Sequence, residues 1–162
     1  MQPPSLSIRP ATASDQPTIV EFNRRLALES EHKQLDAETL RRGVAELLAH
    51  IELGRYFVTE CGGAIIGQAM VTYEWSDWRC GMFWWIQSVY VEHGFRRRGV
   101  FRALYEHIAE QARATPGVCG LRLYVEAQNQ AALATYRQLG MQPSGHLVYE
   151  HDWSAAGESS RP

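Results

Sequence analysis

The sequence predicts an α/β domain in the α+β sense. We expect a mixed sheet of mostly antiparallel N-terminal strands, a central parallel strand–helix–strand unit, and helices on both faces. Two helical segments come first, and a hairpin of two β-type runs follows them. Strand and helix then alternate to the end of the chain, and the unit from residues 82 to 126 favours a right-handed parallel crossover.

The first strand and the two helices are recognised by their apolar spacing. Leu6 and Ile8 alternate with polar neighbours before Arg9-Pro10, which predicts a short strand. Ser14 or Asp15 should cap the first helix and Asp36 the second. The apolar positions of these helices are Ile19, Phe22 and Leu26, followed by Leu40, Val44, Leu47, Leu48 and Ile51.

The rest of the chain alternates between β-type and helical patterns. Residues 56–60 and 64–74 should form a hairpin around a Cys-Gly-Gly turn, and residues 75–81 a loop. Residues 82–91 form an apolar run that is typical of a central strand buried on both faces. The remaining expected elements are a helix with Phe101, Leu104, Tyr105, Ile108 and Ala112 on one side, a strand at 121–126, a helix opened by Asn129 and closed by Gly140, and a last strand at 146–153.

Composition limits the class of protein. The chain has 162 residues, of which 45% are hydrophobic and 21% charged, so we assign residues 1–153 to one domain and expect 154–162 to be disordered. Its formal net charge of -2 argues against nucleic-acid partners. Three widely spaced cysteines without a C-x-x-C pair predict free thiols, a cytoplasmic location and no metal site. No secretion signal and no run of 18 apolar residues is present, so we expect no membrane partner.

The arginine turn after the central strand is the main candidate for binding chemistry. Arg96, Arg97, Arg98 and Gly99 lie where a buried strand should lead into the N-terminus of a helix. Unpaired N–H groups and the helix dipole favour an anion there, and glycine allows close approach to a phosphate. The alternative is a solvated basic loop. Neither G-K-[ST] nor G-x-G-x-x-G is present, which weighs against a nucleoside triphosphatase loop and against NAD binding.

Two motifs in order resemble a known family. Arg96-x-x-Gly99, which follows Val89-Tyr90-Val91, resembles the R/Q-x-x-G-x-G/A motif of the GNAT superfamily of acetyl-CoA-dependent N-acetyltransferases. Downstream, the chain matches that superfamily's N-x-x-A-x-x-x-Y-x-x-x-G element at Asn129, Ala132, Tyr136 and Gly140. The resemblance covers nearly the whole domain. It departs from the motif at Phe101, where the superfamily has Gly or Ala, and we expect that side chain to point into the core.

The resemblance implies acetyl-CoA as cosubstrate. Backbone groups of the strand would bind the pantetheine arm, amides from Arg96 to Phe101 would bind the pyrophosphate, and Asn129 would bond the arm from the opposite side. Tyr136 would lie near the thioester sulfur. The full set is Val89, Tyr90, Val91, Arg96, Arg97, Arg98, Gly99, Val100, Phe101, Asn129 and Tyr136.

The expected reaction moves acetyl to a primary amine, chiefly of a small cationic molecule, by direct attack in a ternary complex. A backbone N–H near Val89 would polarise the carbonyl, and Tyr136 would be the general acid. The central strand offers no carboxylate, so Glu74, directly or through water, is the candidate base. Without the resemblance, Tyr136 would be interpreted as a core aromatic, and Glu74 can equally be a solvated strand-end residue.

The acceptor side is marked by aromatic and acidic residues. They can hold a cationic amine, of a small molecule or a protein, or else be core or a dimer surface; they are Glu29, Glu31, Trp75, Asp77 and Trp85. An exposed last strand and the tryptophan loop are compatible with a homodimer. The alternative function is a catalytically silent acyl-CoA-binding sensor or partner module.

Overall fold

The computed structural model describes residues 5–154 of the chain. Contacts divide the chain into two compact units, of which the first ends at Tyr124 and the second begins at Val125. The disordered tail expected at 154–162 lies, from residue 155 on, outside the described residues.

The first unit contains a five-stranded sheet in the order β1-β2-β3-β4-β5. The first four strands pair antiparallel, whereas β4 and β5 pair parallel, which confirms the predicted mixed sheet. The strands are β1 (Leu6–Pro10), β2 (Gly54–Cys61), β3 (Ala64–Ser76), β4 (Gly81–Val91) and β5 (Val118–Leu123). The expected loop at residues 75–81 is shorter than predicted, because β3 continues to Ser76 and β4 begins at Gly81.

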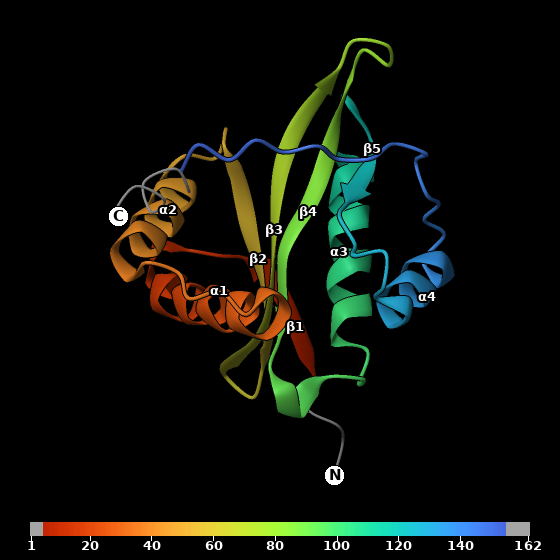
Figure 1. Cartoon of the computed structure of the whole chain (residues 1–162). Helices are drawn as coiled ribbons and strands as arrows, with labels where there is room; N and C mark the ends of the chain where they lie inside the picture. Colours follow the sequence, from red (N-terminus) through yellow and green to blue (C-terminus); the bar gives the residue numbers. More distant parts are fainter. Residues whose placement is uncertain (1–4, 155–162) are drawn as a thin grey trace. The chain divides into compact units, whose positions relative to one another are not determined.

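Helices cover both faces of this sheet, as predicted (Figure 1). The helices α1 (Gln16–Glu31) and α2 (Ala37–Ala49) lie on one face, and α3 (Val100–Ala114) lies on the other. Successive residues of β2 point to opposite faces. Tyr56 and Val58 pack with Ile19 under α1 and α2, while the Phe57 ring lies 5.6 Å from the ring of His107 in α3. Burial of both sheet faces is the main stabilising contribution to this unit.

One of the two predicted N-terminal helix caps is confirmed, and the side-chain cap expected from Ser14 or Asp15 on α1 is wrong. Asp36 accepts a hydrogen bond from the N–H of Thr39 at 2.8 Å, so it caps α2 as predicted. Asp15 directly precedes α1, but its carboxylate accepts from Arg9 and from the N–H of Thr12, both at 2.7 Å. Ile51 lies outside α2 and is exposed, so the predicted apolar stripe of this helix is one residue too long.

The second unit contains the helix α4 (Gln130–Gln138). The side-chain oxygen of Asn129 accepts from the N–H of Ala132 at 3.0 Å, so Asn129 opens the helix as predicted. Gly140 closes it with φ at 83°, its N–H donating to Arg137 O while the N–H of Met141 donates to Tyr136 O. This pair of bonds is a Schellman motif, which satisfies the last carbonyls of the helix.

One predicted strand is not formed, and the bounds of another are wrong. Residues 146–153 are exposed and form no strand, although their pattern alternates. A strand requires a partner for its backbone groups; here the N–H of His146 and of Ser154 donate instead to the nearby side chains of Ser144 and Asp152. The strand expected at 121–126 ends at Leu123, where its pairing with Ile86 of β4 ends.

Candidate active site

The strand β4 changes its pairing in the middle of its length. It pairs with β5 only as far as Ile86, so its last five residues, 87–91, have no partner in β5. Opposite β3, the register shifts between Gln68 and Met70, and Ser88 there has φ at 48°. A positive φ is uncommon in a residue other than glycine, and an extra residue in one strand is a β-bulge. The bulge leaves an open backbone edge on the C-terminal part of β4.

The backbone groups of this open edge point away from β3. Val91 faces Gly67 across the ladder, and the next residue, Glu92, donates its N–H to Ile66 O at 2.8 Å. In antiparallel pairs, bonded and non-bonded positions alternate, so Val91 and Val89 present their backbone groups to the open side. Tyr90 presents its backbone to β3, and its buried ring lies 4.8 Å from Phe22 of α1. The contact predicted between these residues and a ligand arm stays a prediction, and within it the open backbone groups are those of Val89 and Val91.

The arginine turn joins β4 to α3 through a short helix, η2 (His93–Phe95). Arg97 and Gly99 have φ at 62° and 81°, and no residue from 5 to 154 accepts from the N–H groups of Arg97, Arg98, Gly99 or Val100. A Cβ on Gly99 would meet nothing within 4 Å, so a side chain would have room there. Glycine is favoured at this position because of its positive φ. Exposed N–H groups at a helix N-terminus form an anion site.

The two exposed arginines of the turn have no carboxylate partner in the described part of the chain. Arg97 and Arg98 form no ion pair there, and the Arg98 guanidinium lies 5.8 Å from the centre of the Phe95 ring. Their charges add to the positive end of α3, an arrangement that favours an anion by both hydrogen bonds and charge.

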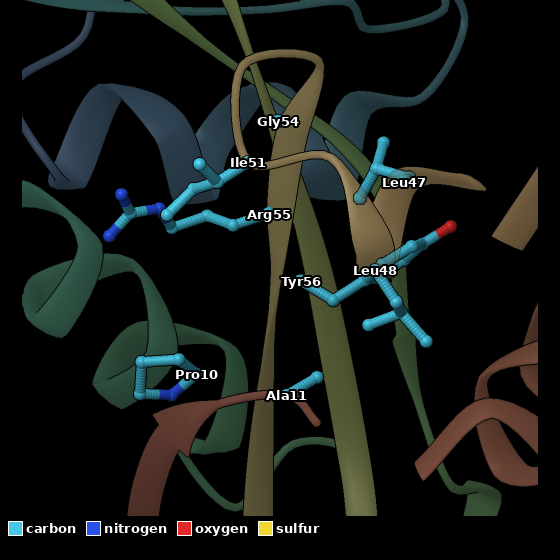
Figure 2. Close-up of a pocket in the computed structure, with 8 residues that line it drawn as sticks. All are labelled: Pro10, Ala11, Leu47, Leu48, Ile51, Gly54, Arg55 and Tyr56. Carbon is cyan, nitrogen blue, oxygen red and sulfur yellow. The ribbon is translucent and has the colours of Figure 1, made fainter. Parts of the chain in front are cut away.

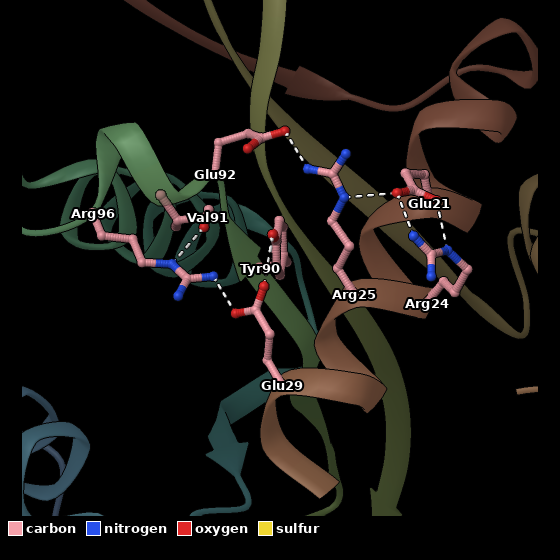
Figure 3. Close-up of polar contacts among 8 residues, drawn as sticks. All are labelled: Glu21, Arg24, Arg25, Glu29, Tyr90, Val91, Glu92 and Arg96. Atoms are coloured by element: carbon pink, nitrogen blue, oxygen red, sulfur yellow. Dashed lines mark hydrogen bonds and ion pairs between the residues drawn. The ribbon is translucent and has the colours of Figure 1, made fainter. Parts of the chain in front are cut away.

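Arg96 has a different role from its neighbours (Figure 3). Its Nε donates to Val91 O at 2.8 Å, and its terminal nitrogen pairs with Glu29 of α1 at 2.6 Å. The Tyr90 hydroxyl donates to the same carboxylate at 3.2 Å. The hydrogen bond from Arg96 lowers the pKa of Glu29 below its ordinary value. Glu29, predicted for the acceptor, is therefore an ionised group at the open end of β4.

Glu74, the predicted base, lies at the other end of the sheet edge. It faces Phe83, six residues before Val89, which is about 20 Å along an extended strand. Arg122 of β5 donates to its carboxylate at 2.9 Å, and the indole N–H of Trp85 donates to it as well. The carboxylate is thus held beside Trp85 and Arg122, and its role as a base, directly or through water, stays a prediction.

The other predicted acceptor residues do not converge. Trp75 is exposed and faces Met82 in the ladder, eight residues before Tyr90, so about 26 Å of strand separates it from the Glu29 contact. Asp77 accepts from the N–H of the neighbouring Trp78, and Glu31 pairs with Lys33. Of the five residues, Trp85 donates to the carboxylate of Glu74, and Glu29 pairs with Arg96 of the arginine turn.

Phe101 and Tyr136 lie on two different helices. At the start of α3 the buried residue is Val100, whereas Phe101 is half-buried beside Tyr105, with ring centres 6.3 Å apart. The expectation that Phe101 points into the core is met only in part, because the buried row of α3 runs through Val100, Leu104 and Ile108 and leaves Phe101 at its edge. Tyr136 lies in α4, and burial raises the pKa of its phenol above the ordinary value of 10.

Sequence reasoning missed two features. Arg122, the partner of Glu74, is 48 residues away in the sequence, and alternation marks it only as a surface residue of a strand. Gln68 is fully buried and donates to Ser88 O at 3.2 Å. The signal for Gln68 was present, since it is a polar residue inside the apolar run IIGQAMV.

A separate groove lies between α2 and the start of β2 (Figure 2). Its lining is mostly apolar, and its charged member, Arg55, donates to the hydroxyl of Tyr73 at 3.2 Å. It lacks the converging polar groups of a catalytic site. Among residues 5–154 no three His, Cys, Asp or Glu side chains cluster as metal ligands would, and no helix there is long and apolar enough to span a membrane.

Comparison with known proteins agrees with this geometry. Residues 20–141 match the model of the Acetyltransferase (GNAT) family. The crystal structure of a possible acetyltransferase from Clostridium difficile 630 is 43% identical, covers 91% of this chain and 97% of that one, and gives a TM-score of 0.85. A predicted acetyltransferase with acetyl-CoA from Clostridium acetobutylicum shares the fold, with 17% identity, 91% and 96% coverage and a TM-score of 0.73.

A curated relative matches over a shorter stretch. The [ribosomal protein bS18]-alanine N-acetyltransferase of Salmonella typhimurium is 43% identical over 53 residues. The match covers 33% of this chain and 35% of that protein, so the chain spans about a third of the length of this relative.

Proposed function

Because the chain belongs to the acetyltransferase (GNAT) family and is an N-acetyltransferase, we propose that it acetylates the primary amine of a small cationic molecule by direct attack in a ternary complex. One observation carries the proposal: β4 opens at its bulge to a bare backbone edge that leads directly into an anion-binding turn. An extended arm with amide groups and a pyrophosphate at its end is the ligand that such an edge and turn fit.

The residues of this edge and turn fit coenzyme A. The N–H groups of Arg97 through Val100, with the side chains of Arg97 and Arg98, would hold the pyrophosphate. Val91 O already accepts from Arg96, so the arm would use the N–H of Val91 and the carbonyl of Val89. The oxygen of Asn129 serves as the α4 cap, which leaves its amide N–H groups for the arm. When bound, acetyl-CoA supplies an acetyl group activated as a thioester.

The chain's own groups would then handle polarisation and protons. The N–H of Val89 polarises the carbonyl, and Tyr136 gives its phenol proton to the sulfur as the carbon–sulfur bond breaks. A tyrosine phenol holds its proton at neutral pH, as a general acid must, and burial raises the pKa of Tyr136 further. Glu74, through water, takes the proton that the attacking nitrogen releases.

A carboxylate beside an aromatic ring supports a cationic acceptor. Glu29 accepts from the hydroxyl of Tyr90 at the open end of β4, and the hydrogen bond from Arg96 keeps its pKa below the ordinary value. A protein amine is the second candidate, and the 53-residue similarity to a ribosomal-protein-alanine acetyltransferase favours it. Cytoplasmic location, the absence of a resident metal and a homodimer remain proposals from the sequence.

The test is release of CoA thiol from acetyl-CoA with a panel of polyamines, amino acids, aminoglycosides and peptides. We expect release that depends on an amine, and we expect Tyr136→Phe to lower kcat about 10²-fold, the lower end of general acid–base catalysis, with KM for acetyl-CoA unchanged. CoA binding by calorimetry without thiol release from any amine would instead identify a silent acyl-CoA-binding module. Activity confined to uncharged amines would contradict the acidic acceptor site.

A further inference from the structure

A buried series of hydrogen-bonded polar side chains ends at the bulge of β4. Gln68 of β3 is fully buried, and its Nε2 donates to the side-chain oxygen of Asn23 at 2.8 Å and to Ser88 O at 3.2 Å. Asn23, on α1, donates in turn to the hydroxyl of Tyr56 at 2.9 Å. Asn23 and Tyr56 are 8% and 4% exposed, so all three side chains of this series are shielded from water.

Gln68 is a destabilising residue for this position. Its Oε1 is buried without a hydrogen-bond partner among the described residues, and its neighbours Ile66, Ala69 and Val71 are buried apolar residues. A buried polar atom without a partner is destabilising, and its presence in a native protein calls for a specific reason. Both N–H bonds of the Gln68 amide are used, and one of them ends on Ser88.

That bond controls the direction of one peptide unit. Ser88 C=O and Val89 N–H belong to the same planar trans peptide, in which the two groups point in opposite directions. Holding Ser88 O toward Gln68 on the α1 face of the sheet therefore turns the N–H of Val89 away from that face. Without the bond, Ser88 would lose a contact that offsets its unfavourable φ of 48°. A donor to the carbonyl also polarises the N–H at the other end of the peptide.

We propose that Gln68, oriented by Asn23 and Tyr56, is a positioning residue that fixes the Ser88–Val89 peptide so that the Val89 N–H meets the acetyl carbonyl. This inference rests on the proposed function. It assigns to α1, β2 and β3 a part in catalysis, although none of the three residues touches the reacting atoms. Gln68 lowers stability, and the gain is a donor that is already aimed before the cosubstrate arrives.

Gln68→Met tests the inference, because methionine has similar length and no donor. We expect kcat to fall about 10- to 100-fold, with KM for acetyl-CoA within about twofold, since loss of one aimed donor costs about 10²- to 10³-fold in related chemistry. The matched control is Thr59→Val. Thr59 is also fully buried, and its Oγ1 has no hydrogen-bond partner among residues 5–154, but it makes no bond to β4, so kcat should not change.

A binding measurement separates positioning from a purely structural role. The parent should bind acetyl-CoA more tightly than CoA, and Gln68→Met should reduce that preference severalfold while CoA affinity stays within about twofold. Asn23→Ala keeps the Gln68–Ser88 bond but removes the acceptor that orients the Gln68 amide, so it should lower kcat about 3- to 10-fold. This variant tests the inference if Gln68→Met does not fold. The double variant should be no worse than Gln68→Met alone.

The outcomes distinguish the inference from the function it rests on. If the parent releases no thiol with any amine, the proposed function fails. If the parent is active, and Gln68→Met and Asn23→Ala keep its kcat and its preference for acetyl-CoA, only the positioning role is overturned.

Discussion

The two halves of β4 differ in whether neighbouring strands pair with their backbone groups on both sides. From Met82 to Ile86 the strand pairs with β3 on one side and β5 on the other, and Trp84 and Ile86 are buried. From residue 87 to Val91 it has the Ser88 bulge, one open edge and a direct connection to the arginine turn. The same strand is therefore a structural element in its first half and a ligand edge in its second.

This difference shows which backbone hydrogen-bond donors of β4 can reach a ligand. In the first half, backbone groups are used by the sheet, and the charged side chains nearby neutralise each other, as Glu74 does with Arg122. In the second half, backbone N–H groups are not paired with β5, and the positively charged Arg97 and Arg98 come shortly after it in the sequence. A bulge thus converts a strand into a binding surface without any unusual side chain.

The largest expected effect is on cosubstrate affinity at the open half. Gly99→Val places a β-branched residue at φ 81°, which only glycine adopts easily, so the turn must rearrange and its N–H groups disperse. We expect CoA to bind about 10²-fold more weakly by calorimetry, a cost within the range of backbone strain at functional sites. Gly94→Val is the control, because a Cβ added to Gly94 also meets nothing within 4 Å but Gly94 lacks a positive φ. Equal losses in both variants would contradict a role for the turn geometry.

An ion pair away from β4 should affect stability without affecting catalysis. The hydrogen bond from Arg9 lowers the pKa of the Asp15 carboxyl from 3.8 to about 2, and the Asp15 side chain is 7% exposed. A lowered pKa in the folded state means that the pair stabilises above pH 3.8 and that this stability is lost as pH falls toward 2. Asp15→Asn should therefore lower the free energy of unfolding by about 2 kcal/mol at pH 7 and by little near pH 2.

Urea unfolding at the two pH values measures this effect. Glu38→Gln, which removes an exposed helix-surface pair with Arg41, is the control and should leave the unfolding midpoint unchanged. The kcat of Asp15→Asn should equal that of the parent. A pH-independent loss of stability in Asp15→Asn would show that the pair contributes packing and not charge.

Much of the fold was predictable because its signals are local. Helix caps at Asp36 and Asn129, the hairpin turn, and the order of strand, arginine turn and helix all depend on residues close in sequence. The resemblance to a known family followed from spacing within such segments.

The features that escaped prediction depend on distant partners. The run Ser88 to Val91 has the pattern of a straight strand, and nothing in it indicates the bulge, which Gln68 and Asn23 support from the other side of the sheet. Glu74 has the pattern of a solvated residue because Arg122 is far along the chain. Residues 146–153 alternate like a strand, yet alternation specifies a face and not a partner.

The smallest expected effect is at the paired half of β4, where Glu74 is proposed to act through water. Glu74→Gln keeps the side-chain volume and an acceptor for Trp85, so the sheet should remain folded, while the proton acceptor is lost. We expect kcat to fall about tenfold, below the usual range for a directly placed base, and the pH–rate profile to change. Glu110→Gln, an exposed carboxylate on α3, should leave the profile unchanged. An unchanged rate and profile in Glu74→Gln would remove it from the mechanism and leave the first half of β4 with a structural role alone, because Arg122 and Trp85 already use its carboxylate.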